Sequence, residues 1–198
     1  TPYDYRARSP DRALSPMLTL AVRRGKRYDG ARKAKAMSWV EKAAIVTVMV
    51  LFMECFAWAT HKYVMHGRLG WGWHRSHHEP HDDKVEKNDL YAAVFSVIVT
   101  AMFTIGIWYP RIWWAALGIT VYGLIYLFVH DMLVHQRFGF RWVPKRGYAK
   151  RLLQAHRLHH AVKGREGTVS HGFLFAPSPA RLKAQLRAID ERAKADAR

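Results

Sequence analysis

The fold class of this 198-residue chain is decided by residues 90–130, LYAAVFSVIVTAMFTIGIWYPRIWWAALGITVYGLIYLFVH. This stretch contains one charged residue, Arg111, beside Pro110. Its two halves, 90–109 and 112–130, each reach the roughly 17–25 residues that a helix needs to cross a bilayer. Because both halves are apolar on all sides, they predict helices that face lipid, not core helices of a water-soluble protein.

The segment Tyr109-Pro110-Arg111 joins the two halves. Since proline cannot continue the preceding helix, the halves are predicted to form an antiparallel hairpin. Residues 43–60, AAIVTVMVLFMECFAWAT, are a third apolar stretch with one acid, Glu54. We therefore expect an all-α integral membrane protein with transmembrane helices near 39–60, 90–109 and 112–130.

Three regions are predicted along the chain. Residues 1–36 form a basic leader that is disordered or non-native, and residues 37–177 form the membrane domain. Residues 178–198 form a basic C-terminal helix or tail, because Leu182, Leu186, Ile189 and Ala193 recur at helical spacing among charges. This helix lies on lipid or on the domain, or is solvated.

The net charge of +17 belongs to the two ends of the chain. Residues 1–38 carry ten Lys or Arg against three acids, and residues 137–198 carry fifteen against four. Basic flanks beside transmembrane helices indicate a cytoplasmic face or anionic lipid and not nucleic-acid binding. Three crossings place the two ends on opposite sides, which conflicts with the positive-inside rule. The conflict is smaller if the protein starts at Met37, because the basic leader is then not part of it.

Ten of the twelve histidines fall into four spaced groups. Two groups have the pattern HxxHH, which places imidazoles at i, i+3 and i+4 on one helical face, so that three rings can converge on one point. The other two have the pattern HxxxxH. The groups are His61 and His66; His74, His77 and His78; His130 and His135; and His156, His159 and His160.

The HxxxxH pairs each begin where a predicted membrane helix ends. Residues i and i+5 lie about 140° apart on an ideal α-helix. Both rings of a pair could bind metal if the pair lay at a helix end or on a bulge, or if each ring bound a different metal. The spacing does not decide between these arrangements. Connectivity places the groups that start at residues 61, 74 and 130 on one side of the membrane.

Ten imidazoles exceed what one metal ion can hold, so two metals are predicted. Structural zinc needs about four ligands, and there is no thiolate cluster to select copper(I) or an iron–sulfur centre. No histidine has glutamate three positions before it, which excludes the carboxylate-rich di-iron motif of soluble bundles. A pair of irons that activates oxygen explains the number of histidines best. The predicted fold is a helical membrane protein with a histidine-rich cytoplasmic cap that houses a di-metal site.

Metal-bound imidazoles usually donate their second N–H to a carboxylate or carbonyl. Candidate acceptors are Glu54, Asp89 and Asp131. Glu54 lies seven positions before His61, on the same helical face, and an acid within a span is a functional candidate. Its alternative role is an interfacial acid paired with Lys or Arg. Outside the four groups, we expect loop residues or supports for ligands at His81 and His171.

Five segments resemble the bacterial β-carotene hydroxylases, a family of the membrane fatty-acid hydroxylase superfamily. They are HKYVMHG (61–67), GWGWHRSHHEP (70–80), NDLYAAVF (88–95), HDMLVHQRFGFRWVPKRGY (130–148) and AHRLHHAVKGREG (155–167). The resemblance extends over about Met37 to Pro177, including the linkers between histidine groups. It departs at the leader and at His171, where an aromatic residue is expected.

The resemblance implies a non-haem di-iron monooxygenase with two iron ions and O2, without haem or flavin. It implies hydroxylation of carbon 3 of each β-ionone ring, so that β-carotene becomes zeaxanthin through β-cryptoxanthin. The family's ten ligand histidines correspond to the ten grouped histidines. The implied electron donor is ferredoxin with its reductase, and the implied location is the bacterial inner membrane with the active site on the cytoplasmic face.

A carotenoid substrate lives in the bilayer, so its ring would enter from lipid. Candidates to line that entrance, or to form an interfacial aromatic belt instead, are Trp71, Trp73, Tyr91, Phe95 and Trp142. Competing functions are a carotenoid ketolase, a fatty-acid or sterol hydroxylase, a desaturase, and a membrane carrier of haem or metal.

Overall fold

The computed structural model describes residues 36–79, 83 and 85–198, and within these residues it contains helices and loops without strands. Residues 1–35, which hold most of the predicted leader, and His81 lie outside the described residues. The elements are α2 (Trp39–Ala59), η1 (Thr60–Met65), α3 (Trp71–His78), α4 (Asp89–Gly106), α5 (Pro110–Tyr126), η2 (Leu127–Val134), η3 (Arg137–Gly139), α6 (Gly147–His160) and α7 (Pro179–Asp196). The predicted all-α class is confirmed.

Three helical segments are long and apolar enough to cross a membrane: Trp39–Met65, Asp89–Gly106 and Pro110–Val134. No more than 17% of the residues in their apolar stretches are buried within the protein. The hydroxyls of Ser96, Thr100 and Thr104 in α4 each donate to the backbone oxygen four residues earlier, at 2.8 to 2.9 Å. Because exposed apolar faces and internally satisfied hydroxyls suit lipid, these helices indicate a membrane protein.

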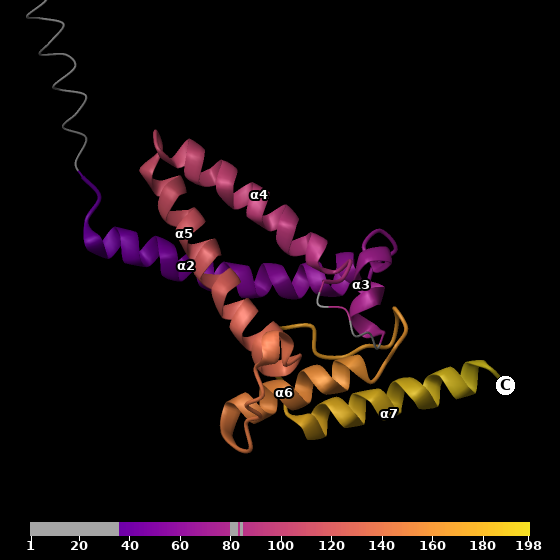
Figure 1. Ribbon diagram of the computed structural model, residues 1–198. Coiled ribbons are helices and arrows are strands. Elements are labelled where there is room, and N and C mark those ends of the chain that lie inside the picture. The colour runs from indigo at the N-terminus through magenta and orange to yellow at the C-terminus, as the bar shows by residue number, and fades with distance from the viewer. Residues whose placement is uncertain (1–35, 80–82, 84) are drawn as a thin grey trace, which may run out of the picture. The chain divides into compact units, whose positions relative to one another are not determined.

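Helices α4 and α5 form the predicted antiparallel hairpin (Figure 1). Pro110 is the first residue of α5, where its fixed φ favours the start of a helix and its missing N–H has no cost. Helix α5 also packs against α2. Their backbones approach closely at Gly118, since a Cβ there would lie 2.6 Å from Cβ of Met49. A small residue at the crossing thus brings together the two helices that continue into η1 and η2.

Beyond the spans, α3 contacts η1, and α6 contacts η2 and α7 (Figure 1). Ser178 caps α7 by accepting a hydrogen bond from the N–H of Arg181 at 3.3 Å. Leu182 is fully buried among Ala155, Val169 and Ala176. The C-terminal helix therefore packs on the domain through its apolar side, one of the positions that its sequence pattern allowed.

Candidate metal centre

Each HxxxxH pair lies on a π-helical segment at the end of a membrane helix. In η1 the N–H of His66 donates to the carbonyl of His61 at 3.0 Å, and in η2 the N–H of His135 donates to that of His130 at 3.0 Å. This i to i+5 bonding places residues five apart above one another on one side of the helix. Both rings of each pair can therefore face one point, which answers the question that spacing left open.

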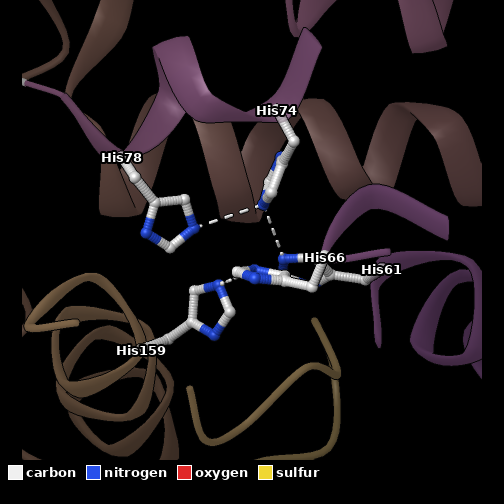
Figure 2. Close-up of side chains that lie close together, drawn as sticks. All are labelled: His61, His66, His74, His78 and His159. Atoms are coloured by element: carbon white, nitrogen blue, oxygen red, sulfur yellow. Dashed lines mark hydrogen bonds between the residues drawn. The ribbon is translucent and has the colours of Figure 1, made fainter. Parts of the chain in front are cut away.

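The first set of converging rings is completely buried, and we call it set 1. One ligand nitrogen of each ring lies within 4.8 Å of every other in the set. Figure 2 shows the rings pointing toward one another from three parts of the chain, η1 with the adjoining His66, α3 and α6. The Nε2 atoms of His61 and His74 are 3.1 Å apart. The members of set 1 are His61, His66, His74, His78 and His159.

The second set, set 2, draws on η2 with the adjoining His135, on α3 and on α6. Four of its rings bring their ligand nitrogens within 4.8 Å of one another, and His130 joins them through an Nε2–Nε2 distance of 3.0 Å to His77. Nε2 of His156 lies 2.9 Å from that of His135 and 2.8 Å from that of His160. The members of set 2 are His77, His130, His135, His156 and His160.

The structure divides each HxxHH motif between the sets, which differs from the expectation that its three rings converge on one point. His74 and His78 belong to set 1 and His77 to set 2, whereas the motif in α6 gives its outer pair to set 2 and His159 to set 1. On a helix, residues i and i+4 are only about 40° apart, while i+3 lies about 100° from i+4. The middle histidine therefore turns toward the neighbouring set.

Every ring of set 1 places Nδ1 beside an oxygen that accepts its hydrogen bond. The pairs are His61 with the carbonyl of His171, His66 with that of Arg165, His78 with that of Val162 and His159 with that of Val169, at 2.9 to 3.0 Å, and His74 with Oδ1 of Asn88 at 2.7 Å. Since a carbonyl oxygen only accepts, Nδ1 carries the hydrogen and Nε2 keeps its lone pair.

These lone pairs face one another, because the Nε2 atoms are only 3.1 to 3.3 Å apart. Neutral nitrogens at this distance repel unless a cation lies among them. Five imidazole nitrogens without a thiolate suit zinc, copper, iron or nickel. The donor set of this chain therefore fits a first-row metal ion at each set of histidines.

Burial keeps the rings in the neutral form that a metal needs. Loss of solvation by burial lowers the pKa of His74 to about 3, that of His78 to about 4 and that of His160 to about 2. For His159, burial and then the neighbouring imidazoles lower the pKa well below its usual value. The rings are therefore unprotonated at neutral pH and available as ligands.

In set 2, two acids take the place of carbonyls. Nδ1 of His77 donates to Glu86 and Nδ1 of His130 donates to Asp131, both at 2.8 Å. Arg137 donates to both carboxylate oxygens of Asp89 at 2.9 and 3.0 Å and lies 3.6 Å from Asp131 and 3.9 Å from Glu86. Asp131 thus lies where an acceptor was predicted, and Asp89 reaches the set through Arg137.

Three polar residues of this network were not predicted: Glu86, Asn88 and Arg137. The signal that could have found two of them is the short segment 79–89 between α3 and α4, in which acids and an amide follow the motif that needs acceptors. Glu54 bonds backbone N–H groups of Phe173, Leu174 and Phe175 instead of an imidazole.

His171 lies beside set 1 and contacts one of its rings. Its carbonyl accepts from His61, and its Nε2 lies 3.0 Å from the hydroxyl of Thr168. Its ring belongs to neither set.

An apolar cavity of about 560 Å³ lies among α2, α4 and α5. Its wall includes two of the predicted entrance residues, Tyr91 and Phe95. Trp73 packs against Tyr91 outside this wall, Trp71 packs against His66 and His78, and Trp142 is exposed. Near the histidines the wall is formed by Tyr126 and Phe173, which stack on His130 and His61.

A family model described as fatty acid hydroxylase matches residues 46–176. A β-carotene hydroxylase of Paracoccus sp. (strain N81106 / MBIC 01143) is 60% identical over 72% of this chain and 89% of its own length. One of Pantoea ananas is 53% identical over 76% and 86%, and a chloroplastic β-carotene 3-hydroxylase of Haematococcus lacustris is 40% identical over 72% and 46%. No solved structure gives a significant match. The chain therefore belongs to the fatty acid hydroxylase family and, within it, to the β-carotene hydroxylases.

Proposed function

We propose that this enzyme hydroxylates carbon 3 of each β-ionone ring of β-carotene, giving zeaxanthin through β-cryptoxanthin. The observation that carries the proposal is the position of two five-histidine sets at one end of an apolar cavity within the membrane spans. The relatives are β-carotene hydroxylases, which supports the substrate, and the Haematococcus relative is named a 3-hydroxylase, which supports carbon 3.

The proposed cofactors are two iron ions, one held by each set, with O2 as co-substrate. Bound iron with O2 supplies the oxidising power that an unactivated C–H bond requires. In the balanced reaction, one oxygen atom enters the C–H bond as a hydroxyl group. The other leaves as water, which takes two protons from solvent and two electrons from a donor. Burial favours the neutral, metal-binding form of the imidazoles in both sets, among them His74 and His78 of set 1 and His160 of set 2.

The cavity residues would hold the substrate and exclude water. Its wall is largely apolar, with Met53, Phe95 and Phe103 from helices that are apolar enough to cross a membrane, so a carotenoid dissolved in the bilayer would reach it from lipid. Tyr126 and Phe173 would form the end against which the ring rests, beside His130 and His61. Exclusion of water protects an oxidising centre from side reactions.

The proposed location is the bacterial inner membrane with the histidine sets on the cytoplasmic face, and the proposed donor is ferredoxin with its reductase. Residues 137–198, which include α6 and α7, carry fifteen Lys or Arg against four acids. A basic surface next to the metal site favours encounter with a negatively charged electron carrier.

Pigment analysis of a β-carotene-producing bacterium that expresses this chain tests the proposal. We expect zeaxanthin with β-cryptoxanthin as the intermediate, and neither in a host that expresses the His159→Ala variant. Unchanged β-carotene, with the protein in the membrane and two irons bound per chain, would contradict the proposal. A keto product or a hydroxylated fatty acid or sterol would assign another substrate or reaction.

A further inference from the structure

Glu54 places a carboxylate inside the first membrane span and accepts four hydrogen bonds there. Its Oε1 accepts from the backbone N–H groups of Phe173, Leu174 and Phe175 at 3.1, 2.9 and 3.0 Å. Its Oε2 accepts from the hydroxyl of Tyr122 in α5 at 2.9 Å. A carboxylate inside a membrane span is energetically unfavourable unless its oxygens are hydrogen-bonded, so Glu54 is a candidate functional residue.

The bonded segment, residues 172–176, lies in the loop between α6 and α7 and is fixed largely by side chains. On its other side, the hydroxyl of Tyr148 donates to the carbonyl of Leu174 at 2.7 Å and accepts from the N–H of Ala176 at 3.1 Å. Gly172 permits the close approach, because a Cβ at that position would lie 3.0 Å from Oε1 of Glu54. The position of the segment therefore depends on Glu54 on one side and on Tyr148 on the other.

The segment positions Phe173, whose side chain lies between the cavity and both histidine sets. Its ring is parallel to that of His61 in set 1, with centroids 5.3 Å apart, and meets His130 of set 2 edge-on at 5.3 Å. It also meets Tyr126 edge-on at 4.7 Å. Phe173 and Tyr122 both line the cavity. One carboxylate thus holds two parts of the cavity wall.

We propose that Glu54 is a positioning residue that determines which carbon of the substrate ring is oxidised. It fixes the depth at which Phe173 stops the ring, and this depth decides whether carbon 3 or a neighbouring ring carbon faces the metal pair. This inference rests on the proposed function, since it concerns the position of attack in that reaction. A displacement of Phe173 by about the length of one C–C bond would exchange neighbouring carbons.

The test compares Glu54→Leu with Glu54→Gln in the full chain, in membranes, with iron bound. Glutamine keeps an acceptor oxygen for the three N–H groups, whereas leucine has none. The control is Thr104→Ala, which removes a polar group from a residue of a span that contacts neither Glu54 nor the segment and is not among the cavity-lining residues. Three quantities are measured: iron per chain, hydrogen exchange of the amides of residues 173–175, and the ring position of the hydroxyl group in each product.

We expect Glu54→Leu to retain iron, and we expect its three amides to exchange about tenfold faster or more, because they lose the acceptor oxygen that they share. Its products should spread from carbon 3 to carbons 2 and 4. Glu54→Gln and Thr104→Ala should keep the wild-type exchange and the wild-type position. Tyr122→Phe, which removes only the contact to Oε2, should fall between Gln and Leu in both measurements.

Two results would overturn the inference: unchanged amide exchange in Glu54→Leu, or faster exchange with oxidation still confined to the wild-type carbon. If Glu54→Leu does not accumulate in the membrane, Gly172→Ala serves instead. It keeps the acid but displaces the segment, because its Cβ would lie 2.9 Å from the carbonyl oxygen of Phe175 and 3.0 Å from Oε1 of Glu54. The same spread of products is expected from it. Failure of the proposed function is distinct, because it would appear as an iron-containing wild type that does not hydroxylate carbon 3.

Discussion

The two histidine sets are built alike but supported differently. Each takes a pair from a π-helical end, a pair at i and i+4 from one HxxHH motif, and the middle histidine of the other motif. In set 1 the Nδ1 groups donate to four backbone carbonyls and the amide of Asn88, whereas in set 2 two donate to carboxylates, Glu86 and Asp131. Set 1 therefore depends on the path of the backbone, and set 2 on a network of charges.

Because of this difference, the two metal positions are expected to differ in electrostatic environment. An imidazole that donates to a carboxylate is a more basic ligand than one that donates to a carbonyl. We therefore expect set 2 to stabilise a more highly charged metal ion better than set 1 does. Arg137 moderates this effect, since it neutralises part of the acid cluster around Asp89.

The largest effect is expected when one ligand is removed from each set in turn. His159→Ala opens set 1, and His77→Ala opens set 2. Each should lower turnover by more than about 100-fold, which exceeds the loss typical of outer partners. Iron analysis should give fewer than two irons per chain in both. Full activity in either variant would contradict the assignment of that ring as a ligand.

Acidification should release the metal and unfold the protein over the same pH range. In the folded protein the pKa of His74 is about 3 and that of His78 about 4, whereas an unfolded histidine titrates near 6.5. The unfolded chain then binds more protons between these values, so the free energy of unfolding falls as pH falls below about 6.5. Circular dichroism and iron release should change in parallel over this window. Iron release at pH 6 from a protein with intact helices would contradict this expectation.

The role of the carboxylates in set 2 can be tested by replacing a carboxylate with an amide there, and an amide with a carboxylate in set 1. Glu86→Gln removes the charge behind His77 and should weaken metal binding or activity by about 10- to 100-fold. Asn88→Asp gives His74 a carboxylate and should make set 1 resemble set 2. Mössbauer spectra of the iron protein should show two iron environments that become more alike in either variant. Two unchanged environments would count against the asymmetry.

Sequence patterns predicted the membrane helices closely because hydropathy and proline act locally. The expected span 39–60 corresponds to α2 with the start of η1, and the hairpin turns at Pro110 as predicted. That the histidine groups starting at residues 61, 74 and 130 lie close together followed from connectivity. Their division between sets did not, because i to i+5 hydrogen bonding at His61 and His130 depends on how η1 and η2 meet α3 and α6.

Sequence patterns could not predict hydrogen bonds and ion pairs between residues that are far apart in the chain. Glu54 was identified as unusual from its place in an apolar stretch, yet its partners lie 68 to 121 residues away. Arg137 was not distinguished from the many other basic residues in the sequence, although it donates to both carboxylate oxygens of Asp89. Composition gives the number of available groups, and only packing decides which of them meet.

The smallest effect is expected at Arg137, which contacts Asp89 and lies 3.6 Å from Asp131 and 3.9 Å from Glu86, the acids that accept from His130 and His77. Arg137→Gln would leave Glu86, Asp89 and Asp131 facing one another with less positive charge between them, so metal retention in set 2 should fall by about two- to tenfold. Arg137→Lys should lie between Gln and wild type, because an ammonium group cannot bind both oxygens of Asp89 in parallel. Competition with a chelator measures retention of each iron. Because set 1 rests on backbone carbonyls, its iron should leave at the wild-type rate, and an equal loss from both sets would mean that the two metal positions are not supported independently.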